Sequence, residues 1–174
     1  MPTTLQPPSM QVYITQAQAQ AHPSAWRIAY EACNAGGQTL WLVDEPALTL
    51  HQTPGYIELS YARAPLQPGA LPYGYFNPRC APLAGGECLR RHIDISWPAR
   101  LSSLWNPARE AAPAPGDYAV TVRVGYGETP TPNAPQVGED VQDSVLRWQR
   151  QALSAPVTVT IAPYAARPAT GAAP

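Results

Sequence analysis

The side chains best suited to acid–base, nucleophilic or metal chemistry in this sequence are three histidines and three cysteines. The histidines are His22, His51 and His92, and the sequence contains neither an HExxH nor a GxSxG pattern. Cys33 or Cys88 with His92 would supply a nucleophile and a base, but no spacing enforces either pair. We therefore predict no catalytic residues and expect that the chain is not an enzyme.

A metal site is the second kind of chemistry that these residue types allow. His92 and Asp94 are two residues apart in "HIDIS", so in a strand they project from one face, and His51 would complete three ligands. Ser96 continues that face, so a solvated polar surface is the preferred interpretation. A separate acidic group lacks the alternating oxygens of a calcium loop and is expected to be solvated: Glu128, Glu139, Asp140 and Asp143. We predict neither metal ligands nor a cofactor.

The cysteines favour one local disulfide. Seven residues, including two adjacent glycines, separate Cys80 from Cys88 in "CAPLAGGEC", so the segment can fold back on itself. A bridge there would contribute about 2–3 kcal/mol in the chain-entropy model. We predict the Cys80–Cys88 disulfide, which leaves Cys33 as a thiol; three reduced thiols are the alternative.

The best candidate for ligand binding is the aromatic segment "LPYGYFNPRC". Tyr73, Tyr75 and Phe76 stand among glycine and proline and are followed by Arg79. Rigid amphipathic rings beside an arginine give contact area at low entropic cost. We predict these four residues as a ligand-binding site within the long irregular stretch 64–91; Arg90 and Arg91 are either further anion contacts or solvated side chains. The alternative is that the rings cap the open end of the fold.

The elements that must position these residues are strands. Residues alternate in polarity with a period of two in about eight short segments: 10–20, 25–34, 39–44, 47–53, 55–63, 92–98, 115–127 and 154–163. The alternation places Trp26, Ile28 and Tyr30 on one inner face and Tyr118, Val120 and Val122 on another. Residues 144–153 fit a strand or a helix, and we favour a strand; residues 99–110 suggest one short helical turn. The fold class is all-β, a sandwich of about seven to nine strands with long loops and flexible termini.

Composition limits the setting and the partners. The net charge is −1, so no field attracts nucleic acid or an anionic membrane, and no apolar run is long enough to span a bilayer. The chain contains 22 prolines and no lysine, which resembles an exported bacterial protein. We expect an extracytoplasmic location if a signal peptide has been removed and a cytoplasmic one otherwise. Residues 1–9 are predicted as an extended lead, 10–163 as one domain, and 164–174 as a disordered tail.

One segment resembles the immunoglobulin-like and fibronectin-type β-sandwiches. In "PGDYAV", Tyr118 occupies the position of their tyrosine corner, and "SAPVTVTI" is similar to their last strand. Trp41, eight residues after Cys33, is similar to their core tryptophan. Val120 stands where an immunoglobulin domain has its second cysteine, so the resemblance is to the broader class. It implies an antiparallel sandwich and says nothing of activity.

These observations lead to a binding hypothesis and two alternatives. The first is an exported accessory or binding module that recognises a protein or glycan partner through its loops. The second is a protease inhibitor that acts through the 64–91 loop, with the Cys80–Cys88 bridge as its closure. The third is a metal-binding periplasmic protein that uses His51, His92 and Asp94.

Overall fold

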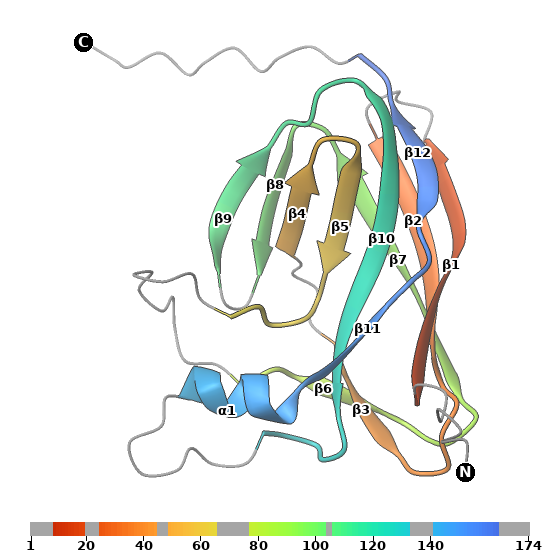
Figure 1. Cartoon of the computed structure of the whole chain (residues 1–174), viewed down its shortest axis with the longest axis vertical. Helices are drawn as coiled ribbons and strands as arrows, with labels where there is room; N and C mark the ends of the chain where they lie inside the picture. The colour runs from red at the N-terminus through yellow and green to blue at the C-terminus, as the bar shows by residue number, and fades with distance from the viewer. Residues whose placement is uncertain are drawn as a thin grey trace, which may run out of the picture.

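The computed structural model shows an almost entirely β-stranded chain (Figure 1). It describes residues 9–19, 25–44, 49–65, 77–103, 106–132 and 141–163. A three-stranded sheet has the order β1-β2-β7 and is antiparallel throughout. Its strands are β1 (Met10–Ala19), β2 (Ala25–Asn34) and β7 (Cys88–Ser96).

The second sheet is built around one long strand, β10 (Gly116–Gly127). Its order is β4-β5-β10-β3-β6, and β11 and β12 also pair with β10. The other strands are β3 (Leu40–Val43), β4 (Thr49–Thr53), β5 (Tyr56–Ser60), β6 (Cys80–Leu83), β11 (Arg150–Leu153) and β12 (Val157–Ile161). The first half of β10 pairs with β5 in parallel and with β12 in antiparallel, and the second half with β11 and β3. β10 therefore holds the whole layer together.

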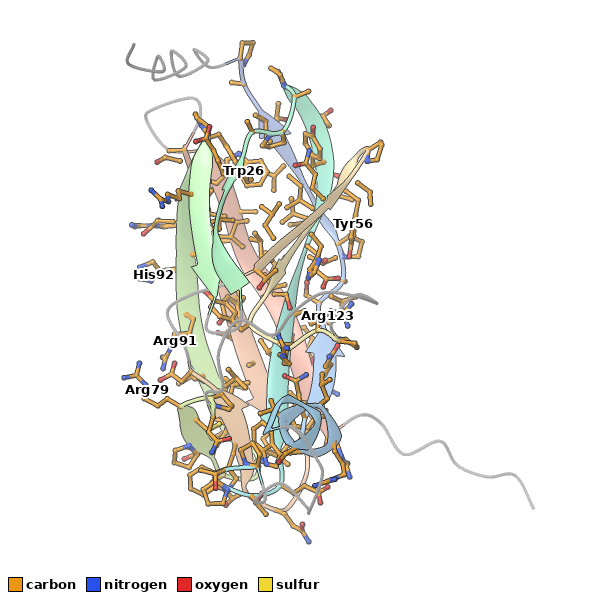
Figure 2. All side chains as sticks on the ribbon, turned by 90° about the vertical axis from the view of Figure 1, so that its left-hand side faces the viewer. Trp26, Tyr56, Arg79, Arg91, His92 and Arg123 are labelled. Carbon is orange, nitrogen blue, oxygen red and sulfur yellow. A yellow bond between two sulfur atoms is a disulfide. The ribbon has the colours of Figure 1, made fainter. Side chains whose placement is uncertain are left out.

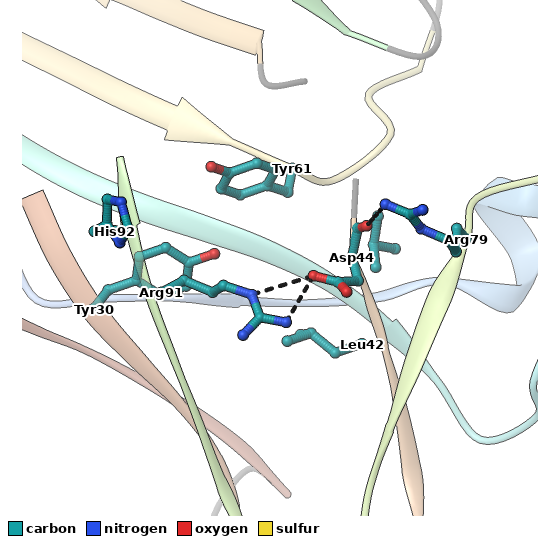
Figure 3. A pocket seen from close by; sticks show the side chains of 8 residues that line it. Tyr30, Leu42, Asp44, Tyr61, Arg79, Arg91 and His92 are labelled. Carbon is teal, nitrogen blue, oxygen red and sulfur yellow. Dashed lines mark hydrogen bonds and ion pairs between the residues drawn. The ribbon is translucent and has the colours of Figure 1, made fainter. Parts of the chain in front are cut away.

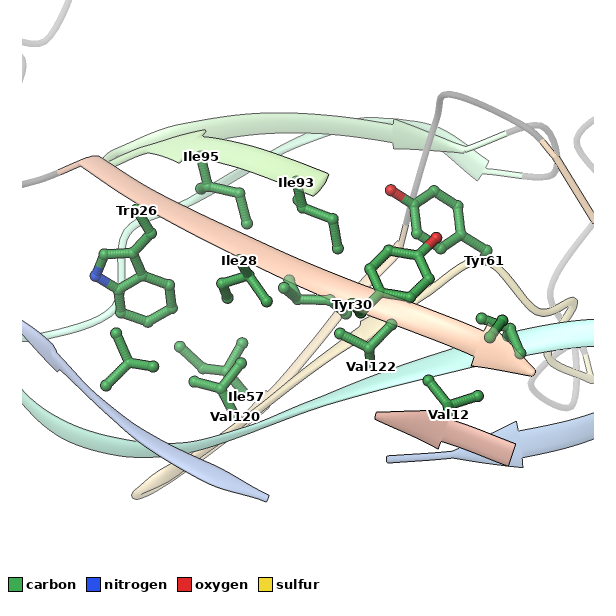
Figure 4. Packing of buried hydrophobic residues seen from close by; sticks show 14 of the residues in the cluster. Val12, Trp26, Ile28, Tyr30, Ile57, Tyr61, Ile93, Ile95, Val120 and Val122 are labelled. Carbon is green, nitrogen blue, oxygen red and sulfur yellow. The ribbon is translucent and has the colours of Figure 1, made fainter. Parts of the chain in front are cut away.

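The core fills the space between the two layers, which Figure 2 views from the side. The predicted inner faces are confirmed, because Trp26, Ile28, Tyr30, Val120 and Val122 are all buried (Figure 4). The Trp26 ring packs edge-on against Trp97 with 5.2 Å between centroids, and its Nε1 donates to the Thr160 carbonyl oxygen at 3.1 Å. That bond ties β2 of one sheet to β12 of the other. The prediction of an all-β sandwich is confirmed.

Two features of the resemblance have different outcomes. The Tyr118 hydroxyl donates to the Ala114 carbonyl oxygen at 2.9 Å, which is the backward contact that a tyrosine corner makes. Trp41 is only half-buried and lies outside the core cluster, so its prediction as the core tryptophan is wrong. Trp26 occupies the centre of the core instead.

Three segments differ from the sequence expectations. Residues 141–148 form α1 (Val141–Trp148), because Val145 and Trp148, three residues apart, pack together against Val43 and Cys80. Residues 99–111 form a hairpin of β8 (Ala99–Ser103) and β9 (Asn106–Ala111), not a helical turn. β6 and the start of β7 lie within the stretch 64–91 that was expected to be irregular. The predicted lead and tail fall almost wholly outside the described residues.

No helix in the described part of the chain combines the length and apolar character that crossing a bilayer requires.

Candidate functional site

A pocket of about 280 Å³ lies where β7 of the first sheet approaches the ends of β3 and β5 of the second. β2 contributes Tyr30, and β7 contributes Arg91 and His92. The opposite wall is formed by Leu42, Val43 and Asp44 at the end of β3, by Tyr61 directly after β5, and by Arg79 directly before β6 (Figure 3). Both sheets therefore supply polar side chains to one cavity.

Two buried phenols form part of the pocket. The rings of Tyr30 and Tyr61 come from different sheets, with centroids 6.2 Å apart and planes tilted by 31°. Burial is the main cause that raises the pKa of Tyr30 far above its ordinary value, and burial raises the pKa of Tyr61 to about 12. Both hydroxyls therefore remain protonated at neutral pH, and because they also hydrogen-bond to each other, one of the two donors is left for a ligand.

The charged part of the pocket is organised around Asp44. Arg91 reaches the Oδ1 of Asp44 through Nε at 3.3 Å and Nη2 at 3.0 Å. Arg79 donates from Nη2 to the backbone carbonyl oxygen of Asp44 at 3.3 Å, and the Asp44 amide donates to the Arg79 carbonyl at 2.9 Å. Two guanidinium groups thus lie against one aspartate, Arg91 on its carboxylate and Arg79 on its backbone carbonyl.

The sequence points to three of these residues: Arg79 for the ligand site, Arg91 as a further anion contact, and His92 as an alternative metal ligand. Arg79 lines this pocket, whereas Tyr73, Tyr75 and Phe76 lie outside the described residues, so the predicted four-residue ligand site stays a prediction. The sequence predicts Tyr30 as a core residue because it shares a strand face with Trp26 and Ile28. Arg91 carried a readable signal, because it shares the inner face of its strand with Ile93 and Ile95, where a charged side chain is unusual.

The predicted Cys80–Cys88 disulfide is wrong. Cys88 is bonded to Cys33, with the two Cα atoms 4.0 Å apart, because the antiparallel register of β2 and β7 sets these residues opposite each other. Cys80 lies on β6 in the other sheet, and its thiol donates to the Pro78 carbonyl oxygen at 3.6 Å. The bridge spans 55 residues, so it contributes on the order of 4 kcal/mol in the chain-entropy model, more than the predicted local loop would. It also removes the closure that the inhibitor hypothesis required.

The candidate metal and nucleophile residues do not converge. His92 Nε2 lies 3.5 Å from Asp94 Oδ2, on the exposed face of β7, and Asp94 is already paired with Arg27. His51 lies in the second sheet, opposite Glu58. His22 lies outside the described residues, and Cys33 is oxidised.

One group of possible metal ligands does converge in the part of the chain that the structure describes. It consists of Glu31, Cys33 and Cys88, whose ligand atoms lie within 4.8 Å of one another.

A second polar cluster stabilises the outer side of the β5–β10 pair. Arg123 donates from Nε and Nη2 to the two oxygens of Glu58 at 2.6 and 2.9 Å, and from Nη1 to Gln151 at 3.0 Å. The Tyr56 hydroxyl lies 2.8 Å from Thr121 Oγ1 and donates to Glu58 at 3.2 Å. These bonds, led by the one from Arg123, lower the pKa of Glu58 below its ordinary value despite burial. The cluster satisfies itself internally and is therefore structural.

Comparison of the sequence and structure with protein-family models, curated proteins and solved structures gives no match. The fold alone therefore defines the class, which is an all-β sandwich with an internal disulfide between neighbouring strands.

Proposed function

We propose that this chain is a non-catalytic binding module of the immunoglobulin-like class, and that it recognises a carboxylate of a partner protein in the pocket between its sheets. The observation that carries the proposal is the pocket itself. Arg79 and Arg91 place two guanidinium groups beside Asp44, and the Tyr30–Tyr61 pair adds a phenol donor. Guanidinium groups bind carboxylates through charge-assisted and often bidentate hydrogen bonds.

A protein partner is favoured over a glycan because an open strand edge borders the pocket. Within the described residues, β7 pairs with β2 alone. The backbone N–H of Asn34 donates to the Glu87 carbonyl oxygen at 2.9 Å, so Glu87 points its backbone groups toward β2. Because this direction alternates along an antiparallel strand, the backbone N–H and C=O groups of Arg90 and His92 point away from β2. An extended segment can pair with such an edge while an acidic side chain enters the adjacent pocket.

Export is part of the same proposal. The Cys33–Cys88 disulfide fits an oxidising compartment, where such bonds form and persist. The Tyr118–Ala114 contact and the two-layer architecture support the immunoglobulin-like class.

Calorimetric titration with extended acidic peptides tests the proposal. We expect a glutamate-containing peptide to bind and its glutamine counterpart to bind at least about tenfold more weakly, because hydrogen bonds to charged groups contribute about 1.5–3 kcal/mol. Arg91→Met should reduce binding by a similar factor. Arg27→Met is the matched control, because Arg27 is also paired with an aspartate but lies on the outer face of the same sheet.

Two outcomes would contradict the proposal. Equal losses in Arg91→Met and Arg27→Met would mean that binding follows total charge and not the pocket. Binding of a uronic acid oligosaccharide, with no binding of any peptide, would replace the protein partner with a glycan.

A further inference from the structure

The outer face of the three-stranded sheet arranges its side chains in rows across β2 and β7. One row consists of Cys33 and Cys88, and the next consists of Glu31 and Arg90. The disulfide joins the first row, and the Arg90 Nε donates to Glu31 Oε1 at 2.5 Å in the second. Two sulfur atoms and a carboxylate oxygen therefore lie within 4.8 Å of one another on this face.

The backbone fixes this arrangement without help from the sulfur–sulfur bond. β2 and β7 pair continuously from Ala25 opposite Ser96 to Cys33 opposite Cys88. Beyond the cysteines, two more backbone bonds continue the contact, from Asn34 to Glu87 and from Gly86 to Asn34. The cysteines are thus held from both sides, so opening the disulfide leaves both side chains on neighbouring strands with their Cα atoms close together.

We propose that reduction of the Cys33–Cys88 disulfide creates a site for a thiophilic divalent cation such as Zn²⁺, with Glu31 as the third protein ligand. A dithiol reductant supplies two electrons and two protons: it becomes a disulfide, and Cys33 and Cys88 become thiols. The cation then binds both sulfurs as thiolates and releases those two protons to solvent. Two thiolates and a carboxylate suit zinc, which takes sulfur and oxygen ligands and accepts a solvent molecule as a fourth.

The surroundings of the cysteines favour both the reduction of the disulfide and the binding of the cation. Cys88 is exposed, so a reductant can reach its sulfur, whereas Cys33 and Glu31 are half-buried and held in place. Arg90 occupies one oxygen of Glu31 and leaves the other for the cation. Two thiolates, one carboxylate and a divalent cation leave one negative charge, which the Arg90 guanidinium balances. The disulfide and the metal-bound state exclude each other, so the redox state of the cysteines decides between a cross-link and a metal site.

Cobalt titration of the whole chain, before and after treatment with a metal-compatible reductant, tests the site. We expect one Co²⁺ per reduced chain, with thiolate-to-cobalt charge-transfer absorption that added Zn²⁺ abolishes. The oxidised chain should show no such absorption. Glu31→Gln should weaken Co²⁺ binding about tenfold or more, because it replaces an anionic ligand with a neutral amide.

The controls separate the site from general thiol binding. Cys80→Ser should keep the full signal, and Asp94→Asn should keep the affinity, because Asp94 is a carboxylate on the same face but several rows away. Cys88→Ser should lose the charge-transfer absorption. Absence of that absorption in a reduced chain whose circular dichroism is unchanged would overturn the proposal. Unchanged affinity in Glu31→Gln, which retains all three cysteines, would remove Glu31 from the site and also overturn it.

Discussion

Two arginine–carboxylate pairs of nearly equal geometry differ in burial, and this difference predicts their contribution to stability. Arg123 binds both oxygens of Glu58 at 2.6 and 2.9 Å, and Arg27 binds both oxygens of Asp94 at 2.7 and 3.1 Å. Both pairs join neighbouring strands. The side chains of Arg123 and Glu58 are 29% and 10% exposed, against 49% and 48% for Arg27 and Asp94. Water screens the second pair much more strongly.

We expect a coupling free energy of about 2 kcal/mol for Glu58 and Arg123. Hydrogen bonds to charged groups contribute about 1.5–3 kcal/mol each, and the neutral amide that Glu58→Gln introduces would still accept one of the two. The measurement is a double-mutant cycle of Glu58→Gln and Arg123→Met by equilibrium urea unfolding at neutral pH. At 174 residues, the single variant Glu58→Gln should lower the melting temperature by about 4–8 °C.

The matched cycle uses Asp94→Asn and Arg27→Met on the outer face of the other sheet. We expect no measurable coupling there, because both partners are about half exposed. Equal coupling in the two cycles would refute the reasoning, since it would show that geometry and not burial determines the contribution.

Three further predictions concern stability. The pKa of Glu58 is lowered from its ordinary value of 4.5. The Glu58 carboxylate therefore stabilises the fold fully above that pH, and this contribution is lost as pH falls through the folded-state pKa. Between neutral pH and about pH 3, the free energy of unfolding measured in urea should fall more for wild type than for Glu58→Gln. Tyr118→Phe removes the hydroxyl bound to Ala114 and should cost about 1 kcal/mol by the same assay, and no loss would show that the contact is not stabilising. In Gly127→Ala the new Cβ would meet the Trp148 ring at 2.1 Å, so a cost of about 1–3 kcal/mol is expected in thermal melts, and an unchanged melting temperature would contradict the packing of α1.

The sequence predicts the fold well where the alternation of polar and apolar residues is compatible with only one type of secondary structure. In β10 and β2 every second residue is apolar, so the buried faces that contain Val122 and Ile28 follow directly. Residues 141–153 have two interpretations, because helical spacing groups Trp148 with Val145, whereas strand spacing groups it with Leu146. Tertiary packing on Val43 decides in favour of a helix for 141–148, followed by a strand.

Neither the disulfide nor the pocket could be predicted from local sequence, and the reason is the same for both. Proximity along the chain favoured Cys80 as the partner of Cys88, whereas the β2–β7 register places Cys33 opposite it. The pocket likewise joins residues from β2, β7 and the ends of β3 and β5, and strand order is not encoded in alternation. Two sequence signals pointed there, Arg79 in the aromatic segment and Arg91 on an otherwise apolar strand face.

The most direct test of the binding proposal is an NMR titration that follows the arginine side-chain ¹H–¹⁵Nε signals as an acidic peptide is added. The pocket predicts saturable shifts of the Arg79 and Arg91 signals, while the Arg27 signal stays in place. Equal shifts of Arg27 and Arg91, or no shift of either pocket arginine at saturating peptide, would contradict the assignment of this pocket as the binding site.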